Sequence, residues 1–73
     1  MNFTAIIERE ADGYVSLCPE LDIASQGDNV TQARDNLHEA VTLFLECASQ
    51  EELHRRLPGE IYITQLEVEV AVG

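Results

Sequence analysis

One long stretch with helical periodicity, residues 29–49, most constrains the fold of this chain. Asn29 and Gln32 have the spacing of a capping box, in which each side chain can satisfy a backbone N–H of the other residue. After this start, apolar residues recur every three or four positions, which places them on one face of a helix. The helix must bury this stripe against another layer. The stripe consists of Val30, Ala33, Leu37, Ala40, Val41, Phe44 and Ala48.

The residues before the helix alternate in polarity and predict three short strands, over residues 2–10, 14–19 and 20–26. Asp12 and Gly13 favour a tight hairpin between the first two strands, because both residues tolerate positive φ. Pro19 cannot donate a ladder hydrogen bond, so it ends the second strand or marks a sheet edge. Gly27 closes the third strand before the helix. We therefore expect a three-stranded antiparallel meander that leads directly into the helix.

The last third of the chain predicts a connector and a final strand. Residues 49–59 are polar and end in Pro58 and Gly59, whereas residues 60–72 alternate again, with a change of phase near Thr64 and Gln65 that predicts a bulge. A helical crossover allows this strand to lie parallel to the first. The sequence thus predicts one α+β domain over residues 1–73, of order β-β-β-α-β. A single helix packs on a four-stranded mixed sheet, made of the antiparallel meander and a final strand parallel to the first.

The small size of the chain predicts self-association. A chain of 73 residues buries only about 60% of the surface that its unfolded form exposes, so it is marginally stable alone. Two cysteines allow at most one internal disulfide and do not resemble a disulfide framework, so we expect both thiols to be reduced. Leu43 and Leu45 lie off the apolar stripe of the helix. We therefore expect a homodimer or higher oligomer, with Leu43 and Leu45 as candidate contacts.

Charge limits the classes of partner. Fourteen acidic residues against four arginines and no lysine give a formal net charge of −10. Because nucleic acids are bound by clusters of Lys and Arg, direct nucleic-acid binding is disfavoured. The acidity fits either a basic protein partner or a surface that only keeps the protein in solution. No basic and apolar leader is apparent, and no apolar run approaches the length of a membrane span. We therefore expect a cytoplasmic protein without membrane contact.

Two groups of residues could carry chemistry, and neither has a specific pattern. Cys18 and Cys47 have acidic neighbours that disfavour the reactive thiolate, and with His38 and His54 they lack the tight spacing of a zinc site. A hard cation could bind to acidic side chains, but the spacing of the candidate acids does not define a cation site. These acids are Asp12, Glu20, Asp22 and Asp28. We expect no catalytic residue, no bound metal and no cofactor, and therefore a protein that is not an enzyme.

Residues 3–46 resemble the N-terminal domain of HicB-family antitoxins, in the form of a small UPF0150-type protein. The resemblance lies in the order of an acidic-Gly turn, a Pro-Glu-Leu segment, a Gly-Asp pair and then a helix. Family members usually continue into a DNA-binding segment, and we expect none from these residues. The matching residues are Asp12, Gly13, Tyr14, Pro19, Glu20, Leu21, Gly27, Asp28, Ala33, Asn36, Leu37, Glu39, Ala40 and Leu45.

The resemblance implies a partial RNase H-like fold and an antitoxin role. The implied partner is a basic HicA-like toxin, an mRNA interferase that the antitoxin neutralises by covering its catalytic and RNA-binding surface. In that role Asp12, Glu20, Asp22 and Asp28 become candidate partner contacts. The alternative is a stand-alone small oligomeric HicB-like protein with an unknown ligand and no toxin partner.

Overall fold

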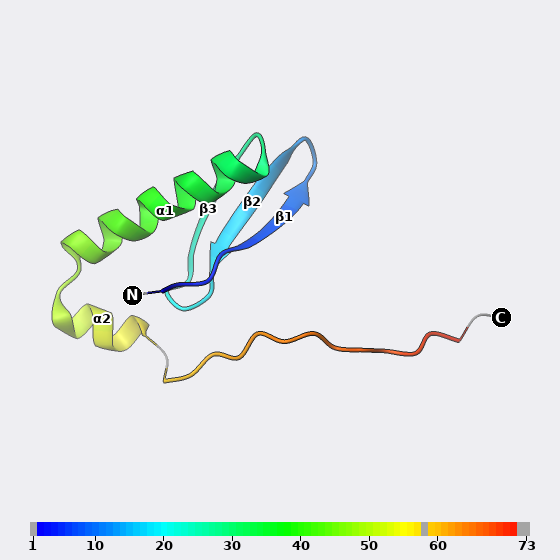
Figure 1. The fold of residues 1–73 in the computed structure, drawn as a ribbon. Helices are drawn as coiled ribbons and strands as arrows, with labels where there is room; N and C mark the ends of the chain where they lie inside the picture. The colour runs from blue at the N-terminus through cyan, green and yellow to red at the C-terminus, as the bar shows by residue number, and fades with distance from the viewer. Residues whose placement is uncertain (1, 58, 72–73) are drawn as a thin grey trace.

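A computed structural model describes residues 2–57 and 59–71. Its sheet has three antiparallel strands in the order β1-β2-β3, formed by Ile6–Glu10, Gly13–Cys18 and Ile23–Gly27. Figure 1 shows the meander with α1 lying across one face of it. The first turn consists of residues 11 and 12, because Glu10 pairs with Gly13, and Ala11 takes the positive φ of 52° that the turn requires. The predicted meander is confirmed.

The two faces of the sheet differ in burial. Ser16 and Cys18 of β2 are buried beneath the helix, whereas Leu17, between them, points to the other face and is partly exposed. Ser16 satisfies its hydroxyl in this environment by donating a hydrogen bond of 2.8 Å to the carbonyl oxygen of Ala33. The alternation of a strand thus places a polar residue in the core, where a helix backbone carbonyl supplies its partner.

Helix α1, Val30–Cys47, begins where the sequence predicts. The side chain of Asn29 accepts a hydrogen bond from the backbone N–H of Gln32 at 2.7 Å, and Gln32 accepts one from the backbone N–H of Asp28. Gln32 therefore bonds one residue earlier than the predicted capping box requires. The buried side of α1 joins the sheet through a small core of Cys18, Leu21, Ala33, Leu37 and Val41.

The predicted connector is wrong over residues 50–56, because these residues form a second helix, α2, Gln50–Arg56. Ser49 caps it by accepting a hydrogen bond of 3.1 Å from the backbone N–H of Glu52. Acids in its first turn and basic residues in its last turn oppose the helix dipole. Arg56 ties α2 to the body, because its guanidinium lies 5.4 Å from the centre of the Phe44 ring and donates a 3.0 Å hydrogen bond to the carbonyl oxygen of Leu21.

The predicted fourth strand is wrong for the residues described. Residues 60–71, called the arm here, form no helix or strand and run as an extended segment beside the body (Figure 1). The observed order is therefore β-β-β-α-α, and the described sheet is purely antiparallel rather than mixed. Alternating polarity predicts an extended backbone but does not select the edge with which that backbone pairs. Pro58 and Val72, which the sequence analysis assigned to the connector and the last strand, lie outside the described residues.

Candidate functional site

The end of β2 and the segment that leads to β3 form a corner, residues 18–22, that is hydrogen-bonded to the start of the chain. The Glu20 carboxylate accepts hydrogen bonds from the backbone N–H of Thr4, at 2.9 and 3.1 Å to its two oxygens, and from the Thr4 hydroxyl at 2.7 Å. The Cys18 thiol donates to the same carboxylate at 3.7 Å. Glu20 thus joins two segments that are sixteen positions apart in the sequence.

These contacts set the protonation of both groups. Burial by itself raises the pKa of the Glu20 carboxyl, but the hydrogen bonds from Thr4, together with its own backbone N–H and the Cys18 thiol, hold the pKa below its usual value. Burial raises the pKa of the Cys18 thiol, and the negative charge of Glu20 raises it further. At neutral pH Glu20 is therefore a carboxylate and Cys18 a thiol, which is the unreactive form of cysteine.

Asp22 shapes the same corner through its backbone. Its φ is 54°, in the left-handed region that Asp tolerates better than most residues, and its side chain is exposed. Leu21, just before it, is fully buried, and its carbonyl oxygen binds Arg56. Asp22 thus ends a turn that points Leu21 into the core while its own carboxylate stays in solvent.

Asp12 and Asp28 lie at the other end of the sheet. They line a shallow polar groove with Glu10, Tyr14 and Gln32, between the β1–β2 turn and the start of α1. This set of three acids, Glu10, Asp12 and Asp28, is called the hairpin end here. Sequence reasoning did not select Glu10, although a two-residue turn pairs it with Gly13, and β2 in turn pairs Tyr14 with Gly27 beside Asp28.

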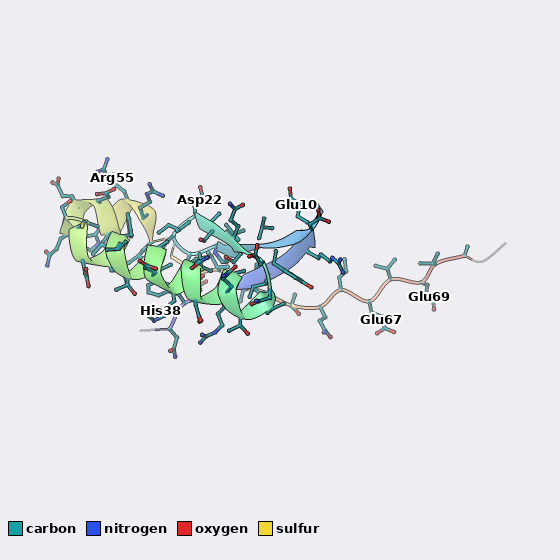
Figure 2. The ribbon with its side chains drawn as sticks, turned by 90° about the horizontal axis from the view of Figure 1, so that it is seen from above. Glu10, Asp22, His38, Arg55, Glu67 and Glu69 are labelled. Carbon is teal, nitrogen blue, oxygen red and sulfur yellow. The ribbon has the colours of Figure 1, made fainter. Side chains whose placement is uncertain are left out.

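The structure thus divides the four predicted contact residues into two pairs. Strand β2 runs from Gly13, next to Asp12, to Cys18, two positions before Glu20, and it spans roughly 17 Å at the usual rise per residue. Figure 2 shows Glu10 and Asp22 at separate places on the body. Asp12 and Asp28 come together at the hairpin end, whereas Glu20 and Asp22 belong to the corner.

Within residues 2–57 and 59–71, no three His, Cys, Asp or Glu side chains are placed to hold a metal ion. Cys18 is buried and Cys47 is exposed, and neither forms a disulfide. No helix in the described part of the chain is long and apolar enough to cross a membrane.

An open groove of about 370 Å³ lies between residues 2–5 and one flank of α1. Its floor and walls include Phe3, Leu37, Val41 and Leu45, and its rim includes Arg34 and His38. Leu45, a predicted oligomer contact, is half-buried against the core, whereas Leu43 is 53% exposed on the far side of α1. The two leucines therefore do not form one surface.

Comparisons with known proteins identify relatives of similar length. The UPF0150 protein ssr1765 of Synechocystis sp. is 38% identical over 66 residues, which cover 88% of this chain and 81% of the relative. The UPF0150 protein ssl0738 of the same organism is 42% identical over 59 residues, which cover 78% of this chain and 81% of the relative. No protein-family model matches the chain. No solved structure matches it either.

Proposed function

This chain belongs to the UPF0150 family, and on that premise we propose that it is an antitoxin-like module that binds a small basic toxin. The proposed partner is a HicA-type mRNA interferase, as the resemblance of residues 3–46 to HicB-family antitoxins implies. The proposed action is to cover the catalytic and RNA-binding surface of that enzyme.

One observation carries the proposal, namely that the acidic surface has almost no internal counter-charge. Among the described residues the only ion pair joins Arg34 and Asp35, at 3.3 Å, and both side chains are largely exposed. The net charge of −10 is therefore not neutralised by ion pairs within the described residues, and it faces the solvent. An exposed acidic surface attracts a basic partner over several ångströms and repels nucleic acid, which selects a basic protein.

The hairpin end fits this contact better than the corner does. Asp12 and Asp28 are exposed, and they lie with Glu10 on a rigid frame of a β-turn and a capped helix start. An enzyme that binds RNA must present basic residues to the phosphates, and carboxylates on a rigid frame can occupy those same residues. The Glu20 carboxylate instead accepts a hydrogen bond from Thr4. We therefore assign Glu20 the role of stabilising the corner.

A double variant tests the proposal. Asp12→Asn with Asp28→Asn removes two charges from the hairpin end, and Glu39→Gln with Glu46→Gln removes the same two charges from the exposed side of α1. With a co-expressed HicA-type toxin, the first pair should weaken the complex by about tenfold or more, and the control pair by much less. Isothermal titration and rescue of growth measure both. Equal losses, or no binding by the unaltered protein at low salt, would refute the proposal.

The alternative function is a stand-alone small oligomer without a toxin. The exposed apolar arm favours association between copies of the chain, which this alternative requires. The two functions differ in genetic context, because only the first requires a neighbouring gene for a small basic protein. They also differ in their response to salt, because salt weakens the attraction of an acidic surface to a basic partner and also the repulsion between two acidic copies.

A further inference from the structure

The arm carries more apolar surface into solvent than a small protein can leave uncovered. Leu66, Val68 and Val70 are 87%, 66% and 78% exposed, and they alternate with Gln65, Glu67 and Glu69. Strict alternation of this kind is the pattern of a strand with one buried face. In Figure 2 the arm extends beyond the body, with Glu67 and Glu69 along it. The arm thus has the sequence pattern of a β-strand but pairs with no strand of the described sheet.

The dimensions of the molecule show how much surface is unpartnered. The chain has an accessible surface of 6170 Å², whereas a compact protein of its mass exposes about 4,500 Å². Its radius of gyration is 15.3 Å, against about 11 Å for a compact domain of this length. The excess is roughly 1,700 Å² in each chain. Two copies that covered it would form an interface within the range of obligate homodimers.

The sheet has one open edge that could receive such a strand. The β3 edge already carries a side-chain contact, since Asn36 donates a hydrogen bond of 2.7 Å to the carbonyl oxygen of Gln26. Just before β3, Arg56 donates one to the carbonyl oxygen of Leu21. At the opposite side of the sheet, β1 pairs only with β2 in the described part of the chain. An unpaired edge of this kind is a template for another strand.

The groove between residues 2–5 and α1 lies at the segment that leads into β1. Helix α1 packs over β2 and β3 and barely touches β1, so this groove between residues 2–5 and α1 stays open. In this groove Phe3 and Leu45 are partly buried, whereas Leu37 and Val41 are already buried. A strand added to β1 would turn one face toward the groove, which Phe3, Leu37, Val41 and Leu45 line. Leu66, Val68 and Val70 fit this apolar surface, and Glu67 and Glu69 then remain on the solvent side.

The chain leaves α2 at Leu57. Leu57 has extended backbone angles, φ −76° and ψ 111°, as expected for the residue before a proline. Exchange of a segment between identical copies is a common route to dimers. Exchange between two copies gives a closed dimer, because each copy supplies one arm and one open edge.

We propose that the arm of each chain adds as a fourth strand to the open β1 edge of a second copy, and that two copies exchange arms. The apolar face of the arm covers the groove between residues 2–5 and α1 of the partner copy. This inference does not depend on toxin binding, which we assign to the hairpin end.

Two substitutions at neighbouring positions of the arm test which face is buried. Val68→Glu places a charge on the apolar face, and Glu67→Gln alters the solvent face. Sedimentation equilibrium should show a dimer for the unaltered protein, at least a tenfold weaker dimer for Val68→Glu, and an unchanged dimer for Glu67→Gln. A monomeric unaltered protein, or equal dimers for both variants, would overturn the proposal. Because Val68 lies outside the core, circular dichroism should show the body folded in each case.

Cross-linking separates exchange from a return of the arm to its own sheet. Glu8 and Glu10 lie on the face of β1 turned away from α1, since Ile7 pairs with the buried Ser16. In a Cys47→Ser background, Glu69→Cys is combined with Glu8→Cys or with Glu10→Cys and oxidised with glutathione disulfide. A covalent dimer on a non-reducing gel is expected from at least one of the two pairs. A disulfide within one chain, or no disulfide in either pair, would overturn the exchange.

Discussion

At the scale of single residues, Glu20 does more for the fold than its place among fourteen acids suggests. Its carboxylate binds the backbone and the hydroxyl of Thr4, so it holds the start of the chain against the corner. Hydrogen bonds to a charged acceptor are stronger than those between neutral groups. Burial raises the pKa of the Cys18 thiol, and the same carboxylate raises it further.

We predict that Glu20→Gln destabilises the protein by about 1 kcal/mol, because the charge that strengthens the Thr4 hydrogen bonds is lost. Urea unfolding followed by circular dichroism measures the free energy of unfolding. Glu39→Gln, at an exposed position on α1, removes the same charge and should change stability by less than about 0.5 kcal/mol. Equal effects of the two substitutions would contradict the role assigned to Glu20.

The stabilisation by Glu20 should depend on pH. Its pKa in the folded protein lies below its usual value, so the folded state binds this proton less readily than the unfolded state does. Its contribution is then complete above the unfolded pKa and is lost as pH falls through the folded pKa. The stability difference between the unaltered protein and Glu20→Gln should therefore shrink from pH 7 to about pH 3. A constant or growing difference in urea unfolding would contradict the assignment.

At the scale of elements, the contact between β3 and α1 depends on a residue without a side chain. A Cβ added to Gly27 would lie 2.4 Å from the backbone nitrogen of Ala33 and 2.9 Å from its Cα. Real Cβ atoms do not approach backbone so closely, and a helix backbone cannot rotate aside as a side chain can. Gly27 thus lets the third strand pass directly under the first turn of α1.

We predict that Gly27→Ala destabilises the protein by about 2 kcal/mol or more, because α1 must shift away from the sheet. Gly59→Ala is the matched control, since its Cβ would meet nothing within 4 Å, and it should be close to neutral. Thermal unfolding compares the two variants. A Gly27→Ala protein as stable as Gly59→Ala would show that the packing of β3 against α1 is looser than the structure indicates.

At the scale of the whole molecule, charge and apolar surface act in opposite directions. A net charge of −10 makes two copies repel each other, whereas the exposed face of the arm favours their association. For a basic partner the same charge is attractive. Salt weakens repulsion between copies and attraction to a basic partner alike.

We therefore predict opposite salt responses for the two proposed contacts. Between about 0.02 M and about 0.3 M salt, self-association should become severalfold tighter and the complex with a basic toxin severalfold weaker. Analytical ultracentrifugation and titration calorimetry measure the two dissociation constants. A self-association that weakens with salt would contradict apolar arm exchange but leave toxin binding untouched. A toxin complex that is insensitive to salt would contradict only the acidic contact.

The sequence by itself determined the elements whose signals are local. The cap at Asn29, the apolar stripe of α1 and the alternation of the meander each depend on residues within one turn or one strand, where spacing alone decides the outcome. Helix α2 was missed because its interior has a single apolar residue, Leu53. Its cap at Ser49 and its ordered charges were nevertheless visible signals.

Only the tertiary structure decided how these elements meet. It joined Glu20 to Thr4 and Arg56 to Leu21, pairs separated by sixteen and thirty-five positions, and it placed the four candidate acids at two ends of the sheet. It also left the arm off its own sheet, although the sequence predicted its extended form. The physical reason is common to all three outcomes. Periodicity specifies the conformation and faces of a segment, whereas its partner depends on which surfaces the rest of the chain leaves open.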